Sequence, residues 1–133
     1  RQGFIGWFIR LAVEGRTIQI YGDGSQLRDF VFVDDATDAF LRAGASDACD
    51  GEVFNVGNTG EVTILELAQR VKSATASTSP VQLVPYDEAY EAGFEDMPRR
   101  VPDISKIQAL VGYEPKLTLD DIIERVVAFM RER

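Results

Sequence analysis

Two short apolar runs flank one amphipathic segment, and this pattern restricts the fold more than any other feature of the chain. The first run, "RDFVFV" at 28–33, carries large apolar residues at successive positions, as strands buried on both faces do. Asp34 and Asp35 are typical of helix starts, and a helix at 35–45 is followed by a second apolar run at 52–56. These proportions predict a βαβ unit with parallel strands and a right-handed crossover. The chain should therefore be an α/β protein that contains the edge of a parallel sheet.

Apolar spacing and helix start signals predict further elements on both sides of this unit. Thr63 with Glu66, and Thr118 with Asp121, have the spacing of capping boxes, so each pair is expected to open a helix. The other expected elements are a helix at 4–14, strands at 17–21 and 81–86, a polar linker at 73–80 and a helix at 104–111 that ends at Gly112.

The residue types that the chain lacks exclude several kinds of site. It contains no histidine, which rules out Ser-His-Asp catalysis, Cys-His catalysis and any His-ligated metal within these 133 residues. We expect no metal site and no catalytic residue of these kinds. Cys49 is the single cysteine, so no disulfide can form within the chain, and a reducing, cytoplasmic location is expected.

Charge and hydropathy indicate which partners to expect. The net charge of −8 argues against a nucleic-acid surface, because such surfaces rest on clustered Lys and Arg. No apolar run approaches the roughly 18 residues of a membrane-spanning helix, and no signal peptide is visible, so no membrane partner is expected. The chain begins at Arg1 and enters a helical pattern almost at once, which we interpret as a sign of a fragment or a processed protein.

The glycine-containing stretch "YGDGSQLRDF" at 21–30 could be a dinucleotide-binding loop or a tight turn between two strands. A dinucleotide-binding loop requires G-x-G-x-x-G between a strand and a helix, but Leu27 occupies the third glycine position and a strand follows. Without a helix N-terminus there is no fan of backbone N–H groups for a pyrophosphate. A tight turn between two strands is therefore the favoured interpretation, because glycine tolerates positive φ.

Arg28 lies where this turn enters the next predicted strand. A guanidinium fixed close to the amides of a loop suits a phosphate or a carboxylate. The alternative is a salt bridge to Asp29 or to Asp34.

Several segments, in order, resemble the extended short-chain dehydrogenase/reductases, which are NAD-dependent nucleotide-sugar epimerases, dehydratases and decarboxylases. "IQIYGDGSQLRDFVFVDDATDAF" resembles the family's G-x-G-x-Q-x-R-D segment, and "GEVFNVGN" and "TILELAQRV" continue the likeness. "RRVPDISKIQALVGYEPKLTLDDIIERVVAFMRER" resembles the usual ending of these enzymes. "CDGEVFNVGN" and "YEAGFEDMPRRVPDI" look most like UDP-glucuronate decarboxylases.

The resemblance implies a set of residues that bind a UDP-sugar or another nucleotide-diphosphate sugar. It implies that Arg28 contacts the diphosphate, that Phe94 lies near the nucleotide and that Arg100 lies near the sugar or the diphosphate. Phe94 stands where a tyrosine is expected in this subfamily, so a hydroxyl contact is lost, and Arg99 is a weaker candidate that a surface position would explain equally well. The complete expected set is Gln19, Tyr21, Gln26, Arg28, Phe94 and Arg100.

The resemblance also identifies what these residues do not contain. The family's Gly-rich NAD fingerprint is absent, and none of Tyr21, Tyr86, Tyr90 and Tyr113 has a lysine four residues later. We therefore interpret 1–133 as one C-terminal substrate-binding domain whose βαβ unit would complete the Rossmann sheet of a full-length enzyme. That enzyme would bind NAD in its N-terminal half, whereas this chain alone should bind no cofactor and be inactive.

Two other interpretations remain open at this point. The chain could be a stand-alone, non-catalytic α/β binding module or gene remnant, or a structural α/β domain that binds no nucleotide sugar. In the full-length enzyme the predicted strands 28–33 and 52–56 would belong to the sheet of the cofactor domain. Separated from that sheet they would expose apolar faces and open edges, so we expect a homo-oligomer that covers them.

Overall fold

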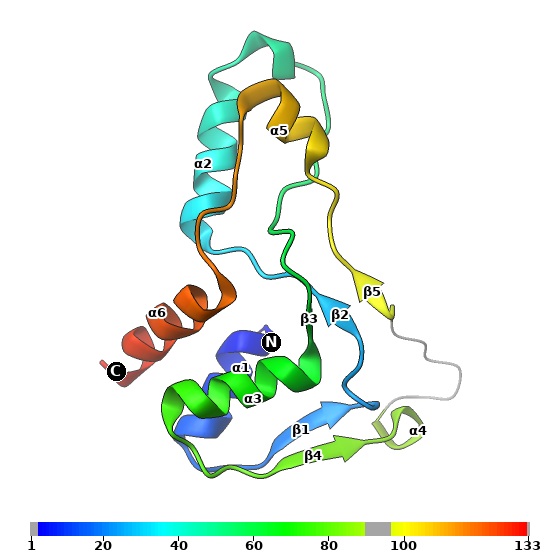
Figure 1. Cartoon of the computed structure of the whole chain (residues 1–133), viewed down its shortest axis with the longest axis vertical. Coiled ribbons are helices and arrows are strands. Elements are labelled where there is room, and N and C mark those ends of the chain that lie inside the picture. The colour runs from blue at the N-terminus through cyan, green and yellow to red at the C-terminus, as the bar shows by residue number, and fades with distance from the viewer. Residues whose placement is uncertain (1–2, 90–96, 133) are drawn as a thin grey trace.

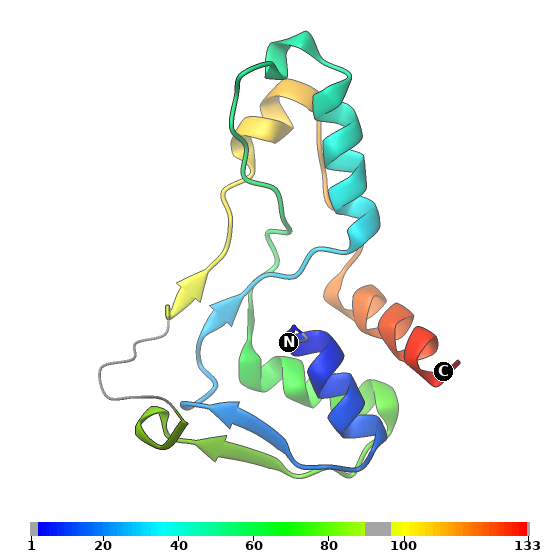
Figure 2. The same cartoon turned by 180° about the vertical axis from the view of Figure 1, so that it is seen from behind.

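A computed structural model describes residues 3–89 and 97–132 of the chain. It is an α/β structure in which two groups of helices lie at opposite ends of the molecule (Figure 1). At one end α1 (Phe4–Val13) and α3 (Ile64–Thr75) lie against β1 (Ile18–Tyr21) and β4 (Val81–Val84). At the other end α2 (Val33–Gly44) and α5 (Ser105–Val111) lie side by side, in this view and from behind (Figure 2). The predicted α/β class is confirmed.

The larger core is formed by α1, α3, β1 and the last helix, α6 (Leu119–Arg131). β1 and β4 pair in parallel, with Ile18 opposite Val81, and the alternation along β1 turns Ile18 and Ile20 inward. The helices contribute apolar faces at helical spacing, as their sequences predict. The buried members that the helices contribute to this core are Phe8, Ile9, Leu11, Ala12, Ile64, Leu67, Ala68, Val71, Ile123 and Val127.

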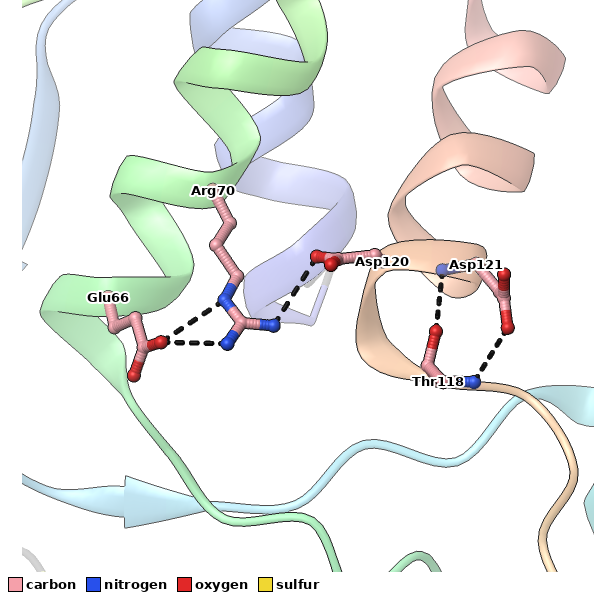
Figure 3. Close-up of polar contacts among 5 residues, drawn as sticks. All are labelled: Glu66, Arg70, Thr118, Asp120 and Asp121. Atoms are coloured by element: carbon pink, nitrogen blue, oxygen red, sulfur yellow. Dashed lines mark hydrogen bonds and ion pairs between the residues drawn. The ribbon is translucent and has the colours of Figure 1, made fainter.

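The N-terminus of α6 has the predicted capping box. Thr118 Oγ1 accepts a hydrogen bond from Asp121 N at 3.2 Å, and the Asp121 carboxylate accepts one from Thr118 N at 2.9 Å (Figure 3). These bonds hold the pKa of Asp121 below its ordinary value. Two backbone N–H groups that the helix itself cannot pair are thereby satisfied.

The start of α3 has only half of its predicted capping box. Thr63 Oγ1 accepts from Glu66 N at 3.0 Å, but the Glu66 carboxylate turns to Arg70, 2.8 Å away (Figure 3). Arg70 also reaches Asp120 at 3.3 Å and so joins α3 to α6. Arg70 lies one turn ahead of Glu66 on the same helix face. The Glu66 carboxylate therefore pairs with Arg70 and not with the backbone N–H of Thr63.

The segment 73–80, expected as a polar linker, is instead ordered against α1. Its first three residues extend α3. Ser77 Oγ donates to Ala12 O at 2.6 Å, and Ser79 Oγ donates to Leu11 O at 3.3 Å. Short hydroxyl side chains thus add a second hydrogen bond to carbonyl groups at the end of α1, which also accept from Gly15 N and Arg16 N.

A smaller core lies between α2 and α5, next to the one-turn 3₁₀ helix η1 (Asp47–Cys49). Its buried members are Ala39, Ile104, Ile107 and Tyr113, and Phe54, Val56 and Val111 pack against them. α5 ends at Gly112 in the left-handed conformation, as expected (φ 67°). The Tyr113 hydroxyl donates to Gly57 O at 2.9 Å, and burial followed by the nearby charge of Asp35 raises the pKa of Tyr113.

Three very short strands join the two ends. β2 (Leu27–Arg28) lies between β3 (Val62–Thr63), which is antiparallel to it, and β5 (Arg99–Arg100), which is parallel to it. A one-turn helix, α4 (Tyr86–Ala89), follows β4. Among the described residues, no helix has both the length and the apolar character that crossing a bilayer requires.

The structure corrects the strands of the predicted βαβ unit. Helix α2 forms within two residues of its expected bounds, but only the first residue of the run 28–33 belongs to a strand, and residues 52–56 belong to none. Parallel strands exist only where neighbouring strands supply hydrogen bonds, and the described part of the chain offers none to these runs. Val53 in the second run is 83% exposed. Completion of a Rossmann sheet by these residues stays a prediction.

Asp35 and Asp34 provide a matched test of what holds the two ends together. The buried Asp35 carboxylate accepts hydrogen bonds from Lys116 N and Leu117 N, both at 3.1 Å, whereas exposed Asp34 meets Arg125 at 3.4 Å. Both carboxylates lie in the first turn of α2, so their interaction with the helix dipole is similar.

Asp35→Asn should lower the free energy of unfolding by about 1–3 kcal/mol, because an amide has one acceptor oxygen for two N–H donors. Asp34→Asn should change it little, since exposed ion pairs contribute little. Urea titration followed by circular dichroism measures both. Equal effects for the two variants would contradict the role of Asp35.

Candidate functional site

The stretch between β1 and β2 is a glycine turn, as predicted. Gly22 and Gly24 have φ of +80° and +76°, a region that other residues rarely adopt. The Asp23 carboxylate accepts hydrogen bonds from the Ser25 hydroxyl at 2.6 Å and from Ser25 N at 2.9 Å, which lowers the pKa of Asp23. The strands on either side belong to different sheets, so the turn redirects the chain between two sheets and does not close a hairpin.

Both glycines are also sites of close approach. A Cβ atom on Gly22 would lie 2.7 Å from the ring of Tyr86, and one on Gly24 would lie 2.9 Å from Cβ of Leu65. The turn therefore packs directly against α4 on one side and α3 on the other. These contacts fix the position of β1 relative to Tyr86 and to the start of α3.

A pocket of about 1100 Å³ opens beside this turn. That volume is at the upper end of the range that ligand pockets occupy. Helix α1 forms one wall, β1 and the glycine turn form another, and α4 and β5 contribute one residue each. Aromatic, amide and arginine side chains line the pocket: Phe4, Trp7, Gln19, Tyr21, Gln26, Tyr86 and Arg100.

The pocket brings together Gln19, Tyr21, Gln26 and Arg100, all of which the resemblance implied as ligand-binding residues. Gln19 and Tyr21 lie on the outward face of β1, because alternate residues of the strand point away from the core. Buried Gln26 donates from Nε2 to Tyr21 O at 3.4 Å, which orients its amide. Phe94 lies outside the described residues. Ligand contacts for all of these residues stay predictions.

Arg28 does not line the pocket. Its side chain is 3% exposed, and one guanidinium nitrogen donates to Leu27 O at 2.7 Å. Arg28 is nevertheless the register partner of Arg100 across the parallel β2–β5 pair. Register partners project on the same face of a sheet, so the two arginines are neighbours on adjacent strands.

Arg99, the neighbour of Arg100 on β5, has a different environment. Its exposed guanidinium forms an ion pair with Glu61, and it does not contribute to the pocket. This environment agrees with a surface role. Successive residues of a strand point to opposite faces, which explains why adjacent arginines differ in this way.

Asp29 adds a carboxylate next to the arginine pair. Burial raises the pKa of Asp29 above its ordinary value, while the hydrogen bond from Asn58 N, at 3.0 Å, and the charge of Arg100 act in the opposite direction. A partly buried carboxylate near Arg100 offsets some of the positive charge at this end of the pocket.

Sequence reasoning missed three aromatic side chains of the pocket, those of Phe4, Trp7 and Tyr86. Phe4 and Trp7 belong to the helix expected at 4–14, but Trp7 is 40% exposed and both rings line the pocket. The apolar face of that helix is wider than packing against one core requires. The additional apolar residues were the signal that could have indicated a second contact surface. Tyr86 was visible only as the end of a predicted strand.

The arrangement suits a ligand with two chemically different ends. Phe4, Trp7, Tyr21 and Tyr86 offer ring faces for a flat apolar group, and the Arg100 end offers positive charge for an anion. Within the residues that the structure describes, no group of three or more His, Cys, Asp and Glu side chains is placed to hold a metal ion. The fold and the pocket define an α/β protein with a cavity that suits such a ligand.

Comparison with known proteins finds relatives among nucleotide-sugar enzymes. Residues 1–57 match the model of the NAD dependent epimerase/dehydratase family. The chain is 35% identical over 130 residues to UDP-N-acetyl-alpha-D-glucosaminuronate decarboxylase of Bacillus cytotoxicus, a match that covers 98% of this chain and 40% of that protein. The chain is thus similar, over nearly its whole length, to part of a sugar-nucleotide enzyme of this kind, which confirms the resemblance seen in its motifs.

Solved structures agree with this assignment. UDP-glucose 4-epimerase from Thermotoga maritima, solved with UDP-glucose, matches with a TM-score of 0.86 and 29% identity over 98% of this chain and 40% of that one. UDP-glucose 4-epimerase from Thermus thermophilus, solved with NAD, matches with a TM-score of 0.80 and 26% identity over 96% of this chain and 40% of that one. The chain spans about 40% of the length of these proteins.

The close approach at Gly24 generates a prediction about the stability of the pocket wall. Gly24→Ala should destabilise the fold by about 1–3 kcal/mol more than Gly51→Ala, because only at Gly24 does the new methyl group meet a neighbour. Gly51 is a matched control: its φ is also positive, at +73°, and nothing lies within 4 Å of a Cβ there. Thermal unfolding of the two variants measures the difference, and equal losses would show that conformation alone requires Gly24.

Proposed function

We propose that this chain is the C-terminal substrate-binding portion of an NAD-dependent nucleotide-sugar epimerase, dehydratase or decarboxylase, and that its pocket holds a nucleoside-diphosphate sugar. The proposal is supported by one observation: aromatic side chains and the Arg100 guanidinium line the same pocket. A nucleobase matches the rings and amides, and a diphosphate matches the guanidinium end. UDP-glucose in the Thermotoga maritima epimerase is a ligand of this class.

Each part of the pocket has a distinct task in this proposal. Tyr21, Tyr86 and Trp7 present ring faces to the base, and the amides of Gln19 and Gln26 bond its polar edge or the ribose. Arg100 contacts the diphosphate directly. Arg28, buried one strand away, adds positive potential at this end of the pocket.

The residues of this chain do not fit NAD at the glycine turn, because the turn leads into β2 and not into the N-terminus of a helix. The cofactor supplies the redox step in this family's chemistry, and we place its binding outside these residues. The contribution of this chain is to bind and orient the sugar nucleotide. A cytoplasmic location of the enzyme is part of the same proposal.

The arginines provide the test of the proposal. Charge-assisted hydrogen bonds contribute about 1.5–3 kcal/mol. Arg28→Ala or Arg100→Gln in the full-length protein should therefore weaken UDP-sugar binding by roughly ten- to hundredfold. Isothermal titration calorimetry with UDP and UDP-glucose measures the change, and steady-state kinetics of the whole enzyme should show it as well.

Arg99→Gln is the matched control, since Arg99 adjoins Arg100 but pairs with Glu61 at the surface. It should leave the affinity unchanged. Arg28 is buried, so Arg28→Ala could also destabilise the fold. Arg100 is exposed, so Arg100→Gln tests binding without this effect. Unchanged UDP-sugar affinity in Arg28→Ala and Arg100→Gln, with the wild type binding normally, would overturn the assignment.

We also propose that the chain forms homo-oligomers through the exposed apolar side chains of α2 and the segment after it. Phe40 is 73% exposed, and Leu41 and Val53 are exposed as well. Phe40→Asp should shift the protein towards the monomer in light scattering, whereas Val13→Asp, an exposed site at the other end of the molecule, should not. A monodisperse wild-type monomer at high concentration would contradict this proposal.

A further inference from the structure

Gly57 is buried at a point where two other segments converge on it. A Cβ atom at this position would lie 2.6 Å from Cγ of Pro102 and 2.8 Å from Oδ2 of Asp29. Neither neighbour can withdraw easily. The ring of Pro102 is rigid, and Asp29 Oδ2 is held by Asn58 N at 3.0 Å. Only glycine allows both segments to approach this closely.

The two converging segments are the continuations of the strands that carry the arginines. Asp29 directly follows Arg28 at the end of β2, and Pro102 lies two residues after Arg100 at the end of β5. Gly57 therefore determines how closely β2 and β5 approach each other downstream of their two-residue ladder. A ladder of two residues cannot fix this distance by itself, because it contains few hydrogen bonds.

The distance between these strands matters because their register partners repel one another. Arg28 and Arg100 carry like charges on the same face of the sheet, and the repulsion tends to separate them. Asp29, packed beside Gly57 and close to Arg100, opposes this repulsion. The space left by the missing side chain thus keeps the Asp29 carboxylate close to Arg100.

The structure assigns to Gly57 a positioning role: by admitting Asp29 and Pro102 to the same space, it holds Arg100 next to Arg28 at the anion-binding end of the pocket. Gly57 lies outside the pocket lining and acts only through the arginine pair. This inference rests on the proposed function, because it assumes that the pocket binds a diphosphate.

Gly57→Ala in the full-length protein should weaken the binding of UDP by roughly tenfold and leave the binding of uridine unchanged. Uridine carries the base and the ribose but no phosphate, so its affinity reports the aromatic end of the pocket alone. Loss of stability without mispositioning would leave the UDP-to-uridine affinity ratio of the folded protein intact. Gly60→Ala is the control, since a Cβ there would lie 3.7 Å from its nearest neighbour.

Pro102→Gly approaches the same contact from the other side and adds no atoms, so it tests the inference even if Gly57→Ala fails to fold. It should also lower the ratio of UDP to uridine affinity, because β5 then loses its contact with Gly57. If Arg100→Gln lowers the ratio but Gly57→Ala and Pro102→Gly keep it, the positioning role is wrong and the proposed function stands. If the wild type binds UDP no better than uridine, both are wrong.

Discussion

The hydrogen bonds of Gly57 and Asn58 are the contacts on which the relation between the two cores depends. Gly57 O accepts from the Tyr113 hydroxyl of the smaller core, and the Asn58 side-chain amide donates to Leu117 O at 3.0 Å, just before α6 of the larger core. Asn58 N donates to Asp29 beside β2. Buried polar groups cost free energy unless they are paired, so these bonds select one arrangement of the two ends.

The pocket is a consequence of this arrangement. Its aromatic wall belongs to α1 in the larger core, while Arg100 comes from β5, whose chain continues into the smaller core. The glycine turn connects these regions by redirecting the chain from one sheet to the other. Features that seem unrelated in the sequence, a turn at Gly22 and Gly24 and a glycine at 57, thus act on opposite ends of the same cavity.

Elements with a complete local signal could be predicted from the sequence, and elements that depend on distant partners could not. Helix 4–14 and the Thr118 capping box needed only apolar spacing and a reciprocal pair, and both formed as expected. The runs 28–33 and 52–56 had strand composition, but a ladder requires neighbours that composition does not reveal. In the pocket, family motifs pointed to Gln19 and Arg100, whereas Trp7 became visible only when the exposed face of its helix was known.

The division into two cores has a consequence for the dynamics of the chain. The core between α2 and α5 has four buried members, far fewer than the core around α1 and α3. Opening free energies follow the amount of apolar surface that a unit buries, so the amide hydrogens of α2 and α5 should exchange with solvent well before those of α3. The smaller core would then behave as a separately opening unit that carries Tyr113 away from Gly57 and interrupts the support of the arginine pair, with the aromatic wall still in place.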